Sequence, residues 1–549
     1  MTFLVPVALL SLFTLLLVYA HGLFRGSLLL PPGPTPVPLL GNIHQLPKNE
    51  IWKALRAWGV QYGDVVFARF LGTRVLVVNS LQAAQDLMDK KSSIYSDRPR
   101  FTLHVELMGL HSMTSHMRYG ERFRKQRRWI HNAVQDKDAV RTFRPMRQRE
   151  TYILLSNLIE RPDDYVTHME QFMGALVMEV AYGHTVRSSD DKYVQIVRQA
   201  TTAVSDVGSS RDEVRDGTAV PVACRQTFTC DSGSRSRHAP MHSSPCHMAR
   251  PAAFVLEYAP QLPPFGSYHQ ASRKAGTSLR SLVSGTDSAR VLCGLHAGKK
   301  STNIAAGEQA ISEGKLTDEE EEDIKGTAGV LFGAGTETTV TTLSVFFLTM
   351  VLHPEVYKKA QEEVDRVVGR GRLPDFDDRD SLPYLECVLK EVYRWNVPLP
   401  LGIPHQLMHD DEYSGYHIPG DTMVFPNIWA MSQDPKFYPD PERFRPERFE
   451  EMDANAAELR DPWHIIFGFG RRICSGRRFA DEAIWIAIAN IVATLNISKA
   501  RDAHGEDITP PLAFSGGFSN CPAPFRCSIL PRSKAAVDLV SQMRANVAA

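Results

Sequence analysis

The chain has 549 residues, of which 62 are Lys or Arg and 62 are Asp or Glu, so its formal net charge is zero. A balanced charge argues against a protein whose main partner is nucleic acid, because such proteins carry a basic excess. With 43% hydrophobic and 23% charged residues, the chain is too apolar to be mostly disordered. Its eight cysteines form no C-x-x-C pair, which argues against a disulfide framework and against a zinc ribbon.

An apolar segment opens the chain. Residues 3–20 are almost wholly apolar, and the first charged residue is Arg25. As a helix this segment would span roughly 27 Å, enough to cross the hydrocarbon core of a bilayer. Because the first positive charge follows the span, residues 1–24 are predicted to be a retained anchor with the rest of the chain in the cytoplasm. A cleaved secretory signal is the alternative, but no convincing cleavage site precedes the prolines that follow.

The remaining chain divides into a short connector and one large body. Frequent prolines between residues 31 and 38 predict a stiff hinge over 25–47. We expect residues 48–535 to form the large domain and residues 536–549 to be a tail. Two stretches, 208–261 and 281–306, lack periodicity and are predicted to be disordered insertions or translated non-coding sequence. A metal site built from Cys224, Cys230, His242 and Cys246 is conceivable, but its spacing matches no standard zinc finger.

The periodic segments of the body are mostly helical. A hairpin is predicted over Val65–Asn79 from alternating β-branched residues around Gly72 and Thr73. Thr317 or Asp318 can cap a very long apolar helix that ends at about Leu352, before Pro354. Shorter helices are predicted over 81–90, 118–131, 355–368, 384–396 and 478–495, with a turn-rich β section after Pro398. The fold class is therefore mainly α with small β-sheets, an α+β protein.

A decapeptide, Phe467–Gly476, carries the strongest chemical signal. Glycines at 468, 470 and 476 let the backbone fold tightly around one thiol, that of Cys474. A helix begins directly afterwards, so its dipole and backbone N–H groups favour a thiolate. Arg472 can lie on the same side as the sulfur and pair with a carboxylate of a bound group. A lone cysteine between glycines is usually a small buried hydrophobe, but the complete F-x-x-G-x-R-x-C-x-G spacing favours a ligand.

With this motif the chain resembles the cytochrome P-450 family, the haem-thiolate monooxygenases. The resemblance runs from the apolar segment to the carboxy terminus, apart from the two irregular stretches. It implies that residues 48–535 are the catalytic domain and that Cys474 binds the iron of haem b. The other cofactor-binding residues of the loop would be Phe467, Gly470, Arg472 and Gly476.

Further motifs follow in the order of that family. Glu391 and Arg394 match its E-x-x-R helix, and Arg448 matches the arginine that completes a structural triad. Glu337 and Thr338, inside the long helix, match the acid and alcohol that deliver protons during oxygen activation, beside small residues that let the helix open locally. Arg127 and His405 match cofactor-binding positions. Phe123 stands where the family has a tryptophan, so one N–H donor to the haem is missing.

The resemblance implies a monooxygenase that inserts one atom of O₂ into an apolar organic substrate. The chain has no Rossmann fingerprint, so electrons would come from an NADPH-cytochrome P-450 reductase. The anchor implies residence in the endoplasmic reticulum membrane, in contact with lipid and with the catalytic domain in the cytoplasm. A basic run, Arg122–Arg128, is a candidate docking face for an acidic partner. Phe143-Arg144-Pro145 and Ala181-Tyr182-Gly183-His184 resemble fungal members of secondary metabolism. Residues 101–116, 397–403 and 514–518 would line the substrate pocket.

Two other functions stay open. One is a haem-thiolate isomerase or dehydratase that needs no reductase, against which Glu337 and Thr338 count. The other is a protein that binds haem but is catalytically impaired, because residues 208–261 lie where the family places the roof of the substrate pocket. Consumption of NADPH and O₂ would separate both from a monooxygenase.

Overall fold

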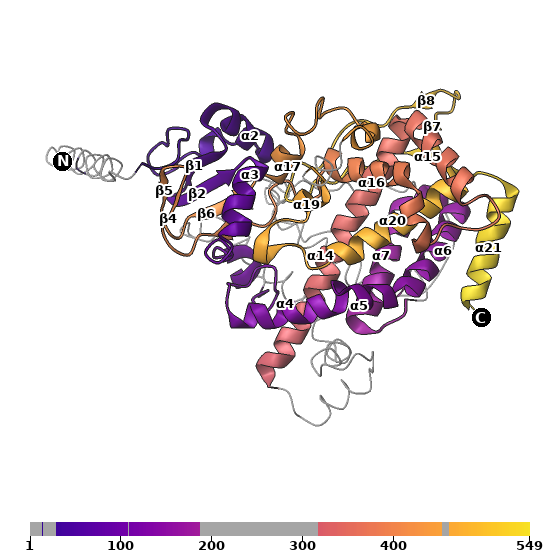
Figure 1. Cartoon of the computed structure of the whole chain (residues 1–549), viewed down its shortest axis with the longest axis horizontal. Coiled ribbons are helices and arrows are strands. Elements are labelled where there is room, and N and C mark those ends of the chain that lie inside the picture. The colour runs from indigo at the N-terminus through magenta and orange to yellow at the C-terminus, as the bar shows by residue number, and fades with distance from the viewer. Residues whose placement is uncertain are drawn as a thin grey trace, which may run out of the picture.

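The structure is a computed structural model that describes residues 14, 29–107, 109–186, 191, 317–452 and 460–548. The described residues form a mainly helical body with small sheets, which confirms the predicted α+β class (Figure 1). The α-helices are α2 (Ile51–Tyr62), α3 (Leu81–Ala84), α4 (Glu121–Val134), α5 (Lys137–Thr142), α6 (Arg144–Glu160), α7 (Tyr165–Tyr182), α14 (Asp318–Leu352), α15 (Pro354–Val367), α16 (Pro383–Trp395), α17 (Ile428–Ser432), α19 (Trp463–Ile466), α20 (Arg477–Thr494) and α21 (Lys534–Ala548).

The strands gather in three sheets. The predicted hairpin forms the antiparallel pair of β1 (Val65–Phe70) and β2 (Thr73–Val78). It continues into β6 (Met423–Pro426), parallel to β2, and β3 (His405–Gln406), antiparallel to β6. This sheet lies at the amino-terminal end of the body (Figure 1). The other two sheets pair β4 (Asp411–Tyr413) with β5 (Tyr416–Ile418), and β7 (Leu495–Arg501) with β8 (Asp507–Ile508) and β9 (Cys527–Pro531).

Helix α14 passes through the centre of the body (Figure 1). Its start is a capping box: the Thr317 hydroxyl accepts from the N–H of Glu320, and the Glu320 carboxylate accepts from the N–H of Thr317. The largest apolar core joins α14 to α6, α7, α16 and α20. Among the described residues, α14 is the one helix long and apolar enough to cross a membrane, but 61% of its most apolar window is buried in the protein. It is therefore a core helix.

The proline-rich stretch runs along the outer edge of β1. The N–H of Phe67 donates to the carbonyl of Pro32 at 3.0 Å, and the N–H of Asn42 donates to the carbonyl of Arg69 at 2.6 Å. Because β1 is an edge strand, these bonds satisfy backbone groups that would otherwise face solvent. Residues 32–42, within the proline-rich hinge predicted over 25–47, are thus hydrogen-bonded to the folded body.

The end of the chain is a helix rather than a loose tail. Helix α21 packs on α6, with Val540 buried in the interface. The Arg544 guanidinium donates to the hydroxyl of Ser156 and pairs with the carboxylate of Glu160 at 2.7 Å. The segment predicted as the tail, 536–549, thus lies mostly in helix α21, which contacts the body. Apart from Thr14, the predicted anchor lies outside the described residues, as do both irregular stretches and the four candidate metal ligands between 224 and 246.

Candidate active site

The loop before α20 wraps around Cys474. The N–H of Cys474 donates to the carbonyl of Phe467 at 2.7 Å, which closes the loop. Gly470 has a positive φ of 56°, and a Cβ there would lie 1.9 Å from the carbonyl oxygen of Met88. A glycine is therefore required at this position for both backbone conformation and space. At Gly476 an added Cβ would meet nothing within 4 Å, so this glycine is not explained by crowding in the described residues.

The Cys474 side chain is accessible, yet protein surrounds it. Desolvation raises the pKa of its thiol, while backbone N–H groups of Gly476 and Arg477 and the charge of Arg127 lower it. The protein atoms around the sulfur therefore disfavour the charged thiolate, although the side chain itself is accessible. The expectation that the helix terminus favours a thiolate is correct in direction for the two N–H groups, but burial outweighs them and the net shift is upward.

Arg472 and His405 lie in a buried cationic cluster with Arg98. The Arg472 guanidinium donates to the carbonyls of Ser96 and Met117, both at 2.7 Å. Its pairing with a carboxylate of a bound group stays a prediction. Burial, followed by the charge of Arg98, lowers the pKa of Arg472 to about 8. His405 on β3 is 5% exposed, and its Nδ1 donates to the carbonyl of Tyr95 at 2.7 Å. Burial and the charge of Arg98 hold its pKa well below the usual range.

Arg127 on α4 points to the cysteine loop. Its guanidinium donates to the Ser475 hydroxyl, and burial lowers its pKa while the nearby Cys474 raises it. Phe123, one turn earlier, is buried, and the Arg472 guanidinium lies 3.7 Å from its ring centroid. Phenylalanine at the tryptophan position therefore provides a cation–π platform in place of an N–H donor.

The three residues of the predicted triad meet in the core. Glu391 accepts two hydrogen bonds of 2.8 Å from Arg394, one helical turn away on α16. It also accepts two bonds of 3.1 Å from the Nε of Arg448. All three side chains are at most 1% exposed. A fully buried cluster of one carboxylate and two guanidinium groups is tolerated because both cations face the carboxylate and all three side chains are hydrogen-bonded.

Glu337 and Thr338 lie in the middle of α14. Burial raises the pKa of Glu337, and a hydrogen bond from the Ser519 hydroxyl lowers it. The Thr338 hydroxyl donates to the carbonyl of Ala334 at 2.8 Å. Ala334 is exposed and an added Cβ at Gly333 would meet nothing within 4 Å, so the helix borders open space here. The expected local opening is absent: α14 is a regular helix, with the Thr338 hydroxyl bonded to its backbone.

Comparison with known proteins places this geometry in a family. The family model described as cytochrome P-450 matches residues 31–213 and 301–526. Cytochrome P-450 monooxygenase 176 of Postia placenta is 40% identical over 520 residues, which cover 95% of this chain and 94% of the relative. Cytochrome P-450 monooxygenase claR of Ampulloclitocybe clavipes is 36% identical over 532 residues, which cover 97% of this chain and 91% of the relative. The chain belongs to the cytochrome P-450 family.

As a cytochrome P-450 monooxygenase, the protein is an oxidoreductase with haem b as cofactor and a cysteine thiolate as axial ligand. It uses O₂, an organic substrate and a redox partner that supplies electrons. The buried cations fit this cofactor. Arg98 is 4% exposed, and its charge, with that of Arg127, lowers the pKa of Arg472. Buried cations that repel one another need anionic partners, and the two propionates of haem are such partners.

Sequence reasoning missed two residues that contact the candidate site. Arg98 donates to the carbonyls of Ile403 and Pro404, at 2.6 and 2.7 Å, and so connects two chain segments about 300 positions apart. Ser519 contacts Glu337 from a loop near the carboxy terminus. Neither belongs to a periodic pattern, although the fixed φ of Pro99 next to Arg98 was an available sign of a constrained turn.

The basic run on α4 is largely used inside the protein. Arg122 donates to the fully buried carboxylate of Asp323 on α14, and Lys125 lies 3.2 Å from the same carboxylate. Arg122 also lies 3.6 Å from Glu319. The start of α14 is therefore an acidic partner of Arg122 and Lys125 within the protein. A docking face on the same run, with Arg127 turned inward, stays a prediction.

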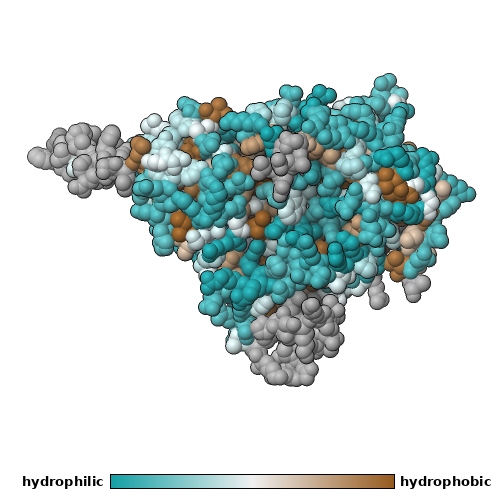
Figure 2. Space-filling view, viewed as in Figure 1, coloured by the Kyte–Doolittle hydropathy of each residue, from teal (hydrophilic) through white to brown (hydrophobic). Residues whose placement is uncertain are grey.

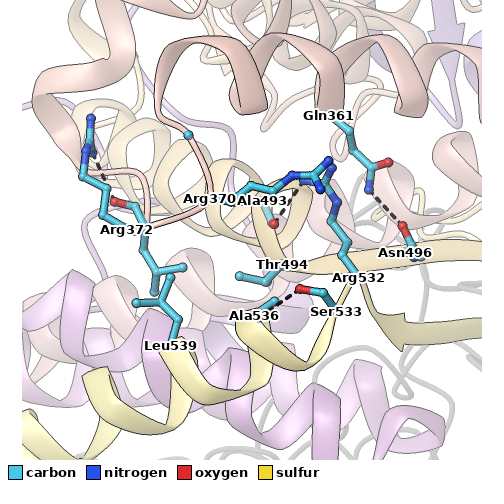
Figure 3. Close-up of a pocket in the computed structure, with 12 residues that line it drawn as sticks. Gln361, Arg370, Arg372, Ala493, Thr494, Asn496, Arg532, Ser533, Ala536 and Leu539 are labelled. Atoms are coloured by element: carbon cyan, nitrogen blue, oxygen red, sulfur yellow. Dashed lines mark hydrogen bonds between the residues drawn. The ribbon is translucent and has the colours of Figure 1, made fainter.

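A separate pocket lies between the end of α15, the α20–β7 junction and the start of α21 (Figure 3). Its volume is about 180 Å³, and none of the predicted site residues lines it. Arg370 and Arg532, two of its cations, both pair with Asp365, at 2.5 and 2.8 Å. The pocket therefore offers little uncompensated charge to a ligand.

Proposed function

We propose that Cys474 is the axial ligand and that the protein inserts one oxygen atom into an apolar secondary metabolite. The observation that carries the proposal is the accessible Cys474 side chain, in a loop closed by its own N–H on the carbonyl of Phe467 and with the N–H groups of Gly476 and Arg477 as donors to the sulfur. A thiolate held this way donates electron density to iron, and such donors tune it. Phe467, Gly470 and Gly476 shape the loop that presents the sulfur.

The protein's own residues would hold the cofactor and supply protons. When bound, haem supplies the activation of O₂. Arg98, Arg127, Arg472 and His405 would bind its propionates, because these groups are buried cations or neutral donors near the loop. Glu337 holds a proton more tightly than an exposed glutamate, and Thr338 lies beside it on α14. Both would pass protons from the protein side into the open space bordered by Ala334.

We assign a structural role to Glu391, Arg394 and Arg448. Their contacts join α16 to the loop before the cysteine segment, since Arg448 also donates to the carbonyl of Pro439 at 2.7 Å. The triad would therefore fix the scaffold behind the haem. The three side chains make many hydrogen bonds in addition to their charge contacts. We therefore assign them a structural role and do not treat them as an ordinary ion pair.

The electron donor would be an NADPH-cytochrome P-450 reductase, and residues 1–24 would anchor the protein in the endoplasmic reticulum membrane with the catalytic domain in the cytoplasm. The sequence supports the anchor through its uninterrupted apolar segment before Arg25. On the surface, which is mainly hydrophilic on the face in Figure 2, Leu39 and Val60 are 84% and 83% exposed. Both belong to the amino-terminal part of the body, where contact with lipid would cover them.

The test is the absorption spectrum of the reduced, carbon-monoxide-bound protein. The wild type should give a thiolate-type band, and Cys474→Ala should lose it. Cys527→Ala, which removes a buried thiol elsewhere in the protein, should keep it. A haem protein whose band survives Cys474→Ala would refute the ligand. Consumption of NADPH and O₂ together with oxygenated product would exclude the isomerase and dehydratase alternatives, and a normal band without product would indicate the impaired protein.

A further inference from the structure

A buried glutamine lies where α4 contacts the beginning of α14 (Figure 1). The side chain of Gln126 on α4 is fully buried, and so is that of its partner Asp323 on α14. The Gln126 Nε2 donates to the Asp323 carboxylate at 2.9 Å and to the carbonyl of Ser112 at 3.1 Å. Its Oε1 accepts from the hydroxyl of Thr114, which is also buried. One amide thus joins two helices to residues 112–114 through both its nitrogen and its oxygen.

The segment that Gln126 holds has no regular secondary structure. Residues 109–120, all of which the structure describes, form turns and bends and no helix or strand. The segment packs closely on α14, because a Cβ at Gly326 would lie 2.3 Å from the carbonyl oxygen of Ser112. Since no helix or strand fixes its backbone, side-chain contacts such as those of Gln126 determine where its carbonyl groups point.

Two carbonyls of this segment orient Arg472. The Arg472 Nη1 donates to the carbonyl of Thr114 at 3.3 Å, and its Nη2 donates to that of Met117 at 2.7 Å. Its Nε donates to the carbonyl of Ser96 at 2.7 Å. A guanidinium group has five N–H donors, so these contacts of the described residues leave one donor on each Nη. Two such donors suit a carboxylate, and a haem propionate is one.

We propose that Gln126 is a positioning residue that, through residues 112–117, orients the Arg472 guanidinium toward a haem propionate. The proposal rests on the proposed function, in which Arg472 binds a propionate. Arg98 depends less on Gln126, because it donates to the carbonyls of Ile403 and Pro404 as well as to that of Ser115. Loss of the Gln126 amide should therefore weaken haem binding mainly through Arg472.

The experiment measures how fast haem leaves the full-length protein when excess apomyoglobin is present to capture it. The variants are Gln126→Ala, Thr114→Val, which deletes the hydroxyl bond, and Thr114→Ser, which keeps it. Asn490→Ala is the matched control. Asn490 is also a fully buried amide, on α20, and it donates to the carbonyls of Pro374 and Ile486 at 3.1 and 2.9 Å. The second readout is the Raman bending band of the haem propionates, which responds to their hydrogen bonds and not to the stability of the fold.

We expect Gln126→Ala to speed haem loss about tenfold, because buried hydrogen-bond partners are lost, and to shift the propionate band. Thr114→Val should change both readouts in the same direction, and Thr114→Ser should match the wild type. Asn490→Ala should lower the thermal midpoint and leave both readouts unchanged. In an Arg472→Ala background, Gln126→Ala should add little to the rate of haem loss.

The proposal is overturned if Gln126→Ala releases haem no faster than Asn490→Ala, or if its effect is equally large in the Arg472→Ala background. If Gln126→Ala gives no soluble protein, Thr114→Val against Thr114→Ser makes the same comparison. If Arg472→Ala itself releases haem at the wild-type rate, the assignment of Arg472 to a propionate fails and the proposal fails with it. Absence of the thiolate-type carbon-monoxide band in the wild type would instead contradict the axial ligand, which is a failure of the proposed function.

Discussion

Glu391 on α16 and Glu337 on α14 are both glutamates enclosed by the protein, but their surroundings differ completely. Glu391 accepts hydrogen bonds from Arg394 and Arg448 and from the N–H of Arg445, and its side chain is fully buried. Glu337 has one neutral hydroxyl as partner, and burial raises its pKa. The Glu391 carboxylate is paired with two positively charged side chains, whereas no charged partner is found for Glu337 among the described residues.

This difference separates a structural acid from an acid suited to proton transfer. A carboxylate held by two guanidinium groups cannot accept a proton without leaving buried cations unmatched. A buried carboxyl group with a single neutral donor can change its protonation state without breaking the scaffold. Residue type and helical position do not distinguish the two glutamates, but their partners do.

The largest effect should come from Glu391→Gln. The neutral amide leaves two buried guanidinium groups without a counter-charge, so the fold should lose about 4 kcal/mol. We expect little or no soluble protein with bound haem, measured by the haem-to-protein ratio and the thermal midpoint. Glu362→Gln, which alters an exposed ion pair on α15, is the matched control and should behave like the wild type. Normal haem content in Glu391→Gln would contradict the structural role.

Glu337→Gln should have the opposite effect to Glu391→Gln, because it should reduce activity and preserve the fold. The amide keeps the size of the side chain and can still bond to Ser519, so folding and haem content should be preserved. Without the acid, formation of oxygenated product should fall about 100-fold and peroxide should rise. Glu321→Gln, near the exposed start of the same helix, is the control. Unchanged product formation would show that Glu337 does not deliver the protons.

Asp323→Asn tests a third acid, at the start of α14. Its carboxylate is fully buried but its partners, Arg122 and Lys125, are only partly buried. Loss of the charged bonds should cost about 2 kcal/mol, less than at Glu391 because water can reach the cations. The measurement is the free energy of unfolding in urea, with Asp318→Asn as the exposed control. If the free energy of unfolding fell as much as is expected for Glu391→Gln, the partly exposed position of Arg122 and Lys125 would not reduce the cost.

The smallest effect concerns pH. Since burial raises the pKa of Glu337 above its ordinary value of 4.5, its contribution to stability is fully present below that value and is lost as pH rises through the folded-state pKa. The Glu337→Gln variant lacks this loss. Its thermal midpoint relative to the wild type should therefore be higher at neutral pH than at pH 4.5. A difference that does not change with pH would show that the carboxyl group is not desolvated.

Much of this architecture is predictable because its signals are local. The capping box at Thr317, the boundaries of α14 and the β1–β2 hairpin depend on neighbours in the chain, and the structure confirms them. The glycine spacing around Cys474 likewise encodes a loop in which Gly470 must have a positive φ. By contrast, the pairing of the basic run on α4 with Asp323 joins segments about 200 residues apart, and charge counts alone suggested an external partner.

The sequence by itself determined the long helix α14, the thiol loop and the family, because local backbone preferences and fixed spacings are written in consecutive residues. Tertiary structure alone decided which buried charges are neutralised and which groups stay free to react. Arg98 lies near Arg472 and His405 only because distant segments pack together. The same holds for Ser519 and Glu337. Desolvation and hydrogen bonding depend on everything that surrounds a group, so they exist only once the chain is folded.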